Sequence, residues 1–173
     1  DIKINLSEIK EAINKLIGVN NQTVPLYSAV HVNGKKLYEY ARNNIEVELP
    51  KRDVNIYNID LISDIYYEDN RPCFNIRTTV SKGTYIRSLI KDINKKLGIL
   101  GVMSDLIRTR QGKFLINDSY SLEDMENNNY NVLTITDVLK DENCAIIDST
   151  LFKKVKNGAI INNKYNTDMV TFI

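Results

Sequence analysis

The stretch Ser81-Lys82-Gly83-Thr84-Tyr85-Ile86-Arg87-Ser88-Leu89 decides the fold of the chain's first part. It follows Phe74 to Val80, in which apolar and polar residues alternate as in a strand, and it precedes a helical pattern that Gly98 ends. The apolar positions of this pattern are Ile86, Leu89, Ile90, Ile93 and Leu97. The stretch therefore predicts a turn from a strand into a helix, with Tyr85 and Arg87 in the first helical turn.

Arg87 lies off the apolar stripe of this helix, beside backbone N–H groups that favour anions. An exposed arginine in the first turn opposes the helix dipole at a cost of about 0.3–1 kcal/mol. A carboxylate or a phosphate next to Arg87 would offset that cost. A surface arginine beside a structural glycine turn is the competing interpretation, and the physical argument alone slightly favours it.

The residues upstream of this stretch predict a helix, an excursion and a strand. Ile9, Ala12, Ile13, Leu16 and Ile17 have helical spacing, with Ser7 as the expected N-cap and Gly18 as the stop. Asn20 to Pro25 is expected to be irregular because it is polar. Residues 25–52 are expected to form an exposed excursion with a short helix from Leu37 to Arg42. Val54 to Tyr67 is rich in β-branched and aromatic residues and is predicted to pair antiparallel with Phe74 to Val80, across residues 68–72.

The residues downstream predict shorter elements. Leu106 to Leu115 is predicted to be a strand, and Ser121 is expected to cap a short helix. Residues 126–131 form a polar break and a candidate domain boundary. The predicted elements beyond it are a strand at Ala145–Ile147, a helix at Ser149–Asn157 stopped by Gly158, a strand at Ala159–Ile161 and the beginning of a strand at Met169–Ile173. Both ends of the chain are interpreted as trimmed.

Composition excludes several classes of function. The 43% hydrophobic and 26% charged residues are typical of a globular protein, and no apolar run approaches the roughly 20 residues that span a bilayer. Cys73, Cys144 and the single His31 are too few and too far apart for a disulfide framework or a zinc site. The cysteines are therefore expected to be reduced.

The net charge of +1 conceals an uneven distribution. Residues 30–115 contain 15 Lys and Arg against 10 Asp and Glu, whereas residues 116–173 contain 5 against 9. A basic middle is compatible with a bound polyanion. Ordinary solvated surface charge remains the preferred explanation on charge alone.

Three stretches, in the same order, resemble the TruB family of bacterial T-loop tRNA pseudouridine synthases. They are Pro25 to Arg42 (PLYSAVHVNGKKLYEYAR), Ser81 to Leu89 (SKGTYIRSL) and Leu106 to Phe114 (LIRTRQGKF), followed by Ser121-Leu122-Glu123. The resemblance runs from about Ser7 to Met125, with a weaker echo at Ala145 to Ile161. Three motifs in order are specific, whereas one motif alone would carry moderate weight.

The resemblance implies roles for individual residues. Arg87 corresponds to the arginine that orients the catalytic aspartate, and Tyr85 to a residue of the pocket that receives the flipped uridine. Leu106 corresponds to an apolar wall of that pocket, and Lys82 and Gly83 lie in the same motif. Residues 25–52 correspond to a thumb loop that closes over the tRNA T-loop. The implied RNA-binding residues are Tyr27, Lys35, Lys36, Tyr38, Arg42 and Arg108; Tyr38 and Tyr40 could equally hold the loop together.

The sequence also departs from the family. His31 stands where the family usually has Lys, and Val80 stands where it often has Cys; neither position is catalytic. The family's nucleophilic aspartate lies in a Gly-x-Leu-Asp context, and no such sequence occurs in this chain. A pocket tyrosine in a Lys-x-Tyr context is assigned to the same missing part. We therefore expect the chain alone to be inactive.

The resemblance implies an α+β fold. Residues 1–126 are expected to be the second half of a pseudouridine synthase core, with a mixed, largely antiparallel sheet and flanking helices, and residues 127–173 a linker and the beginning of a PUA-like β domain. The implied reaction converts the T-loop uridine (position 55) of tRNA to pseudouridine in the cytoplasm, with no cofactor, metal or membrane.

The full protein is expected to be a monomer, and the fragment to self-associate through uncovered edges and apolar faces. A non-catalytic tRNA-binding or folding module is the alternative function. A guide-RNA-dependent rRNA pseudouridine synthase ranks below both, because those relatives lack the sequence motif of the thumb loop.

Overall fold

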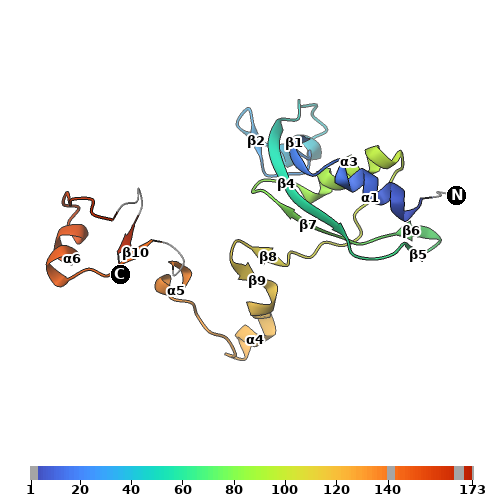
Figure 1. Cartoon of the computed structure of the whole chain (residues 1–173). Helices are drawn as coiled ribbons and strands as arrows, with labels where there is room; N and C mark the ends of the chain where they lie inside the picture. Colours follow the sequence, from blue (N-terminus) through green and yellow to red (C-terminus); the bar gives the residue numbers. More distant parts are fainter. Residues whose placement is uncertain (1–3, 140–142, 166–169, 173) are drawn as a thin grey trace. The chain divides into compact units, whose positions relative to one another are not determined.

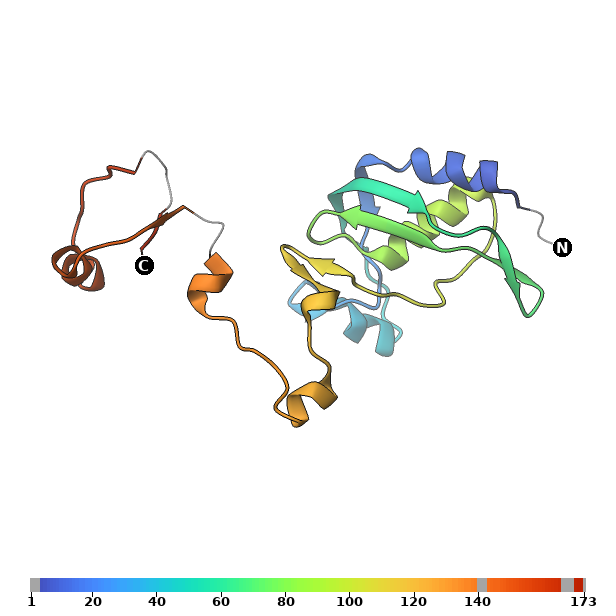
Figure 2. The same cartoon turned by 60° about the horizontal axis from the view of Figure 1, so that its bottom comes forward.

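The computed structural model describes residues 4–139, 143–165 and 170–172 and divides the chain into two compact units, Asp1–Ile107 and Arg108–Ile173. The first unit contains a three-stranded antiparallel sheet in the order β1-β4-β7, formed by β1 (Gly18–Thr23), β4 (Lys51–Leu61) and β7 (Ile76–Val80). Helices α1 (Leu6–Asn14) and α3 (Ile86–Leu97) contact each other and the sheet (Figures 1 and 2). The prediction of an α+β fold with a largely antiparallel sheet is therefore confirmed.

The two helices and the central strand share one hydrophobic core. Its buried members are Ile9, Ile13 and Leu16 near α1, Ile56 and Ile59 on β4, and Leu89 and Ile93 on α3. The apolar residues that were predicted from helical spacing therefore face this core. They are Ile9, Ile13 and Leu16 near α1, and Leu89 and Ile93 on α3. Gly98 adopts the left-handed conformation at the end of α3, with φ +66°, as predicted.

A β-bulge explains why two residues three positions apart in β4 both face the core. Ile56 pairs with Val80 and Asn58 pairs with Thr79, so Tyr57 is an extra residue in β4. An extra residue reverses the alternation of side chains between the two faces. Ile56 and Ile59 are consequently both buried, while Tyr57 is 57% exposed.

The prediction that Asn20 to Pro25 is irregular is wrong for most of that segment. Residues 18–23 form strand β1, which pairs antiparallel with residues 51–56 of β4. The inward-facing residues of β1 are polar, and their side chains bond to backbone. Asn20 Nδ2 donates to the carbonyls of Leu16 and Gly18 at 2.7 and 2.9 Å. Strand formation here follows from pairing with β4 rather than from local propensity.

The predicted ends of the first helix are also corrected. Asn5, not Ser7, is the N-cap of α1, and it forms a capping box with Glu8. The helix ends at Asn14, and Gly18, with φ +106°, begins β1 instead of stopping the helix. The capping box explains the shift, because the Asn5 and Glu8 side chains each accept a hydrogen bond from the other residue's backbone N–H.

The thumb segment, residues 25–52, contains a small hairpin and the predicted helix. Strands β2 (His31–Val32) and β3 (Lys35–Lys36) pair antiparallel around Asn33 and Gly34, both of which have positive φ. Helix α2 (Leu37–Arg42) has the predicted bounds. Leu37 is fully buried and therefore anchors this helix.

A second hairpin joins β4 to β7. It consists of β5 (Tyr66–Glu68) and β6 (Arg71–Cys73), with Asp69 and Asn70 at positive φ in the turn. The predicted antiparallel pairing across residues 68–72 is therefore confirmed. The long predicted strand from Val54 to Tyr67 is divided into β4 and β5.

The second unit is made of short elements, and none of its described residues is buried. The elements are β8 (Arg110–Gln111), β9 (Phe114–Leu115), the 3-10 helix η1 (Ile116–Asp118), α4 (Leu122–Glu126), α5 (Ile135–Leu139), β10 (Cys144–Ala145), α6 (Ser149–Lys156) and β11 (Thr171–Phe172). Ser121 caps α4 as predicted, and α6 follows its predicted bounds to within a residue.

Two predicted strands of this part are wrong. Leu106 to Leu115 is irregular up to Thr109 and then forms the β8–β9 hairpin, because Gly112 turns the chain at φ +59°. Ala159 to Ile161 has no strand, and Ile160 is fully exposed. The strand predicted at Met169–Ile173 appears as β11, which pairs parallel with β10; Met169 and Ile173 lie outside the described residues. The PUA-like domain and its boundary at residue 127 stay predictions.

In the described part of the chain, no helix has the length and apolar character that crossing a membrane requires.

Candidate functional site

The turn that leads from β7 into α3 is fastened to the central strand. Ser81 N–H donates to Asn55 O at 2.8 Å, and Asn55 N–H donates to Ser81 Oγ at 2.9 Å. Thr84 Oγ1 donates to Ser81 O at 2.9 Å, which closes the turn. Gly83 has φ +87°, and a Cβ there would lie 3.4 Å from Nη1 of Arg52. Glycine therefore serves both the backbone conformation and the close approach of an arginine.

Tyr85 is the N-cap of α3, but its side chain makes no capping hydrogen bond. A residue of β1 takes that place. Gln22 Oε1 accepts a hydrogen bond of 2.8 Å from Tyr85 N–H, and Gln22 Nε2 donates to Tyr85 O at 3.2 Å. Gln22 is 2% exposed. Both polar groups of a buried amide therefore hold one residue of the motif.

The same helix is joined to β1 at a second point. Ser88 Oγ donates to Thr23 O at 2.9 Å, and Ser88 is 8% exposed. Together with the Gln22 bonds, this contact positions the first turn of α3 against the end of β1.

Arg87 is exposed and reaches the thumb segment. Its Nη2 donates to the backbone carbonyl of Tyr27 at 2.9 Å. A guanidinium has five N–H donors, so this bond leaves donors for a second acceptor. Within the described residues, no carboxylate forms an ion pair with Arg87. The described partner of Arg87 is thus a neutral carbonyl and not the carboxylate or phosphate that would offset the helix dipole.

Arg52 lies over Tyr85 from the first part of β4. Its Cζ is 5.9 Å from the centroid of the Tyr85 ring, which is the range of a cation–π contact. The ring of Tyr85 is therefore held by Arg52, while its backbone is held by Gln22.

A second group of cations and an aromatic ring lies on the thumb segment. Lys36 Nζ is 5.7 Å and Arg42 Cζ is 5.2 Å from the centroid of the Tyr38 ring. Lys35 is exposed in the adjoining hairpin. Two cations beside one ring form a surface that can contact phosphates and stack on a base.

The remaining thumb tyrosines differ in exposure. Tyr40 is 9% exposed, and its hydroxyl donates to Val32 O at 2.8 Å, so its role is to hold the thumb segment together. Tyr27 is 60% exposed and can contact a ligand.

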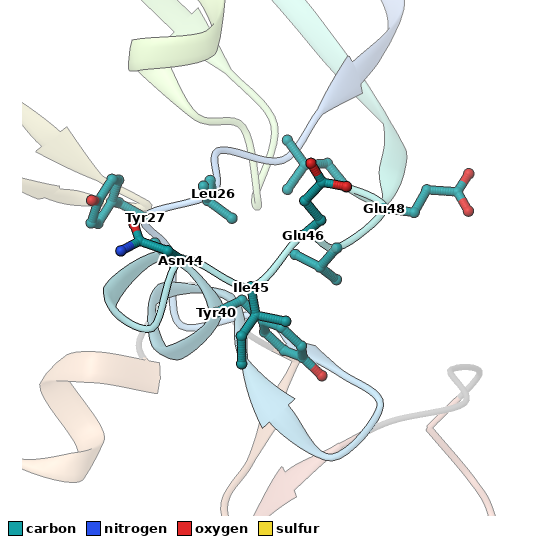
Figure 3. Close-up of a pocket in the computed structure, with 10 residues that line it drawn as sticks. Leu26, Tyr27, Tyr40, Asn44, Ile45, Glu46 and Glu48 are labelled. Carbon is teal, nitrogen blue, oxygen red and sulfur yellow. The ribbon is translucent and has the colours of Figure 1, made fainter.

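An open pocket of about 750 Å³ lies within the thumb segment (Figure 3). Figure 3 shows Tyr27, Tyr40 and Ile45 on its walls together with Glu46 and Glu48. Two carboxylates make this pocket a poor site for a polyanion. Tyr85 and Arg87 are not among its lining residues.

The resemblance also implies roles for Lys82, Leu106 and Arg108. Lys82 is exposed in the turn beside Gly83. Leu106 is 55% exposed in the irregular segment after α3, and its N–H donates to Asp105 Oδ1 at 2.7 Å. Arg108 belongs to the second unit, where Nη1 donates to Gln111 Oε1 at 2.9 Å. The contacts described above bring together Gly83, Tyr85 and Arg87, but they include neither Leu106 nor Arg108.

Sequence reasoning missed Gln22 and Arg52. Gln22 lies in a stretch that was expected to be irregular, so nothing indicated that it would be buried. Arg52 stands at the end of the predicted excursion, and only the pairing of β4 with β1 and β7 places it beside Tyr85. No local pattern in the sequence would have identified either residue.

Burial raises the pKa of Asp92 on α3, and the neighbouring Lys95 and Lys96 offset only part of this effect. Among the described residues, no three His, Cys, Asp or Glu side chains gather in a cluster that could hold a metal ion.

Comparison with known proteins shows a family match in the first half of the chain. A family model described as "TruB family pseudouridylate synthase (N terminal domain)" matches residues 1–86. A tRNA pseudouridine synthase B from Bacillus velezensis is 40% identical over 162 residues, covering 90% of this chain and 52% of that protein.

Two further relatives carry the same name. One from Bacillus licheniformis is 42% identical over 159 residues, covering 88% of this chain and 52% of the relative. The other, from Bacillus subtilis, is 40% identical over 164 residues, covering 91% and 53%. The chain therefore spans about half the length of the curated relatives it matches.

Proposed function

Because the chain belongs to the TruB family of pseudouridylate synthases, we propose that the full protein containing it isomerises the T-loop uridine of tRNA to pseudouridine. The observation that carries this proposal is the placement of Tyr85, the N-cap of α3, which is bonded to β1, and of Arg87, in the first turn of α3, which contacts the thumb segment. The family match and the 40% identities support it.

The proposed chemistry needs a carboxylate nucleophile, which would be supplied outside this chain in a Gly-x-Leu-Asp context. Arg87 would pair with that aspartate. A neighbouring guanidinium lowers the pKa of a carboxyl group and orients it by paired hydrogen bonds. The donors of Arg87 that are not used for Tyr27 O suit this role.

In the proposed reaction, the target base leaves the stack, which costs a few kcal/mol. The N1–C1′ bond between the base and the ribose breaks, the base rotates, and C5 forms a new bond to C1′. The C5 proton is lost to solvent and N1 takes up a proton, so the reaction is a net isomerisation. Tyr85 would pack in the pocket that receives the base. Its position is held by Gln22 and Arg52, which favours a fixed ring over a mobile one.

The thumb segment would supply RNA contacts. Lys36 and Arg42 beside Tyr38 provide positive charge and a stacking surface, and Lys35 and Tyr27 are exposed nearby in the sequence. Arg108 is proposed to add a phosphate contact. Residues 127–173 are proposed to begin a PUA-like domain, and the full protein is proposed to act as a cytoplasmic monomer, without cofactor or metal.

A non-catalytic tRNA-binding module is the second candidate. The cluster of Lys36, Tyr38 and Arg42 favours it, because such a surface gives affinity without chemistry. The two functions differ in one measurable property, the loss of the C5 proton of the uridine.

The test is release of tritium from tRNA labelled at C5 of uridine. A protein consisting of residues 1–173 is compared with the natural full-length protein. A tRNA whose T-loop uridine is replaced by cytidine serves as the control substrate. Release by the full-length protein from the first tRNA only is the expected result. Binding of tRNA by both proteins without any release would establish the binding module instead.

A further inference from the structure

Gln22, on the edge strand β1, makes two hydrogen bonds to one residue, Tyr85. Its amide oxygen accepts from Tyr85 N–H at 2.8 Å, and its amide nitrogen donates to Tyr85 O at 3.2 Å, across 63 positions of sequence. Only a side chain that carries both a donor and an acceptor can satisfy an N–H and a C=O of the same residue. Asparagine is one methylene shorter, and Glu and Met lack the donor.

The residue that Gln22 holds is the origin of α3. The Tyr85 carbonyl also accepts the first hydrogen bond of that helix, from Leu89 N–H at 3.0 Å. Since Tyr85 has no cap of its own, Gln22 satisfies the backbone N–H that would otherwise be unpaired at the helix start. The direction in which α3 leaves the turn therefore depends on this amide.

The position of the Tyr85 backbone determines the positions of two groups of the proposed active site, the Tyr85 ring and the Arg87 guanidinium. The Tyr85 ring lies under Arg52, and Arg87 stands two residues further along the same turn and reaches Tyr27 O at 2.9 Å. A shift of the Tyr85 backbone would move both the ring and the guanidinium. Displacements of about 1 Å from a mutation outside the reacting groups can reduce a rate about 100-fold.

We propose that Gln22 is a positioning residue of the isomerisation, which sets Tyr85 and Arg87 through the two backbone hydrogen bonds. This inference rests on the proposed function. Gln22 is 2% exposed and is not expected to touch the RNA, so its loss should affect the rate of the chemical step and not the affinity for tRNA.

The chain offers a matched control. Ser88 is also buried, and its hydroxyl joins the same helix to the same strand, but its bond goes to Thr23 O and bypasses Tyr85. Gln22→Met and Ser88→Ala thus each remove a buried link between β1 and α3. Only the first releases Tyr85.

The experiment uses the full-length protein and tRNA labelled with tritium at C5 of uridine. Single-turnover release, the Kd for tRNA and the Tm are measured for the wild type, Gln22→Met, Gln22→Asn and Ser88→Ala. We expect both Gln22 variants to lower the single-turnover rate about tenfold or more, with the Kd changed less than about threefold. Ser88→Ala is expected to lower the rate less than about threefold.

The outcomes separate this proposal from the proposed function. A wild type that releases no tritium overturns both. With an active wild type, equal rate losses in Gln22→Asn and Ser88→Ala at matched Tm overturn the positioning role. A loss confined to the Kd overturns it as well, and so does failure of both Gln22 variants to fold, because the amide is then needed for the fold alone.

Discussion

Arg87 donates a hydrogen bond of 2.9 Å from Nη2 to the backbone carbonyl of Tyr27, 60 positions earlier in the chain. The bond joins the first turn of α3 to the beginning of the thumb segment. A guanidinium that touches the thumb and can still donate to a carboxylate connects the two parts of the proposed site. Movement of the thumb on binding RNA would therefore change the position or the hydrogen bonding of Arg87.

Arg87→Ala in the full-length protein is expected to lower turnover about 10- to 100-fold, because hydrogen bonds to a charged group contribute about 1.5–3 kcal/mol. The Kd for tRNA should change less than about threefold. Tritium release and filter binding measure the two quantities. Lys91→Ala, which removes one exposed positive charge from the same helix, is the control. Parallel losses of rate and affinity in Arg87→Ala would contradict a role at the aspartate.

Arg52→Ala removes the cation above the Tyr85 ring, which is 5.9 Å from its centroid. A cation–π contact at a partly exposed site is worth about 0.5–1 kcal/mol, so we expect a two- to fivefold lower turnover at about the same Kd. Arg42→Ala removes the corresponding contact on Tyr38 and should instead weaken tRNA binding. If both variants lower turnover, or if both weaken tRNA binding, the separate roles of Arg52 and Arg42 are contradicted.

Tyr38 and Tyr40 are expected to respond differently to substitution. Tyr40→Phe removes the 2.8 Å bond to Val32 O and should reduce the free energy of unfolding by about 1 kcal/mol without changing tRNA affinity. Tyr38→Ala should reduce the affinity by about 1–3 kcal/mol if a base stacks on its ring. Urea unfolding and filter binding decide the matter, and a normal affinity for Tyr38→Ala would exclude stacking.

Leu89→Ala should reduce the free energy of unfolding by about 2–5 kcal/mol, because Leu89 is fully buried in the core shared by α1, β4 and α3. Leu100→Ala is the matched control, since Leu100 is 95% exposed and should change stability by less than about 0.5 kcal/mol. Both values follow from urea unfolding monitored by circular dichroism. Similar losses for the two variants would show that Leu89 is not a core residue.

Asp92→Asn should raise the Tm at pH 7. Burial raises the pKa of Asp92 above its usual value of 3.8, so the folded state holds the proton more tightly than the unfolded state. Stability of the wild type therefore falls as pH rises from 3.8 through the folded-state pKa, and then levels off. The Tm advantage of Asp92→Asn should be largest above that range and vanish below it. Asp64→Asn, at an exposed position, is the comparison, and a pH-independent Tm difference for Asp92→Asn would refute the assignment.

Local patterns predicted the elements whose cause is local. Helix α3 runs from Ile86 to Leu97 and ends at Gly98, as its apolar spacing and its glycine indicate. Helix α2 also has its predicted bounds. By contrast, β1 was missed, since the sequence Gly18-Val19-Asn20-Asn21-Gln22-Thr23 has no apolar alternation and becomes a strand only through its partner β4. The bulge at Tyr57, which allows both Ile56 and Ile59 to be buried, was also missed, because it depends on the pairing of β4 with β7.

The candidate site divides in a similar way. The motif from Ser81 to Leu89 indicated Tyr85 and Arg87 as site residues, and the thumb motif indicated Tyr38 and Arg42 as RNA-binding residues. The structure added Gln22 and Arg52, and it distinguished Tyr40, which is buried, from Tyr38, whose ring lies close to two cations. Burial depends on neighbours from distant segments, so no pattern within the thumb could distinguish the two tyrosines.

The sequence by itself determined the helix after Gly83, the thumb helix and the family, because the spacing of apolar side chains and the short sequence motifs involve only neighbouring residues. The tertiary structure alone decided that a polar strand lies beside the motif and that Gln22 and Arg52 hold Tyr85 from its backbone and its ring. Those contacts join residues 33 to 63 positions apart, and hydrogen bonds and cation–π contacts act only at short range. Chain folding must first bring such residues together, and that juxtaposition is a property of the whole sheet and its core.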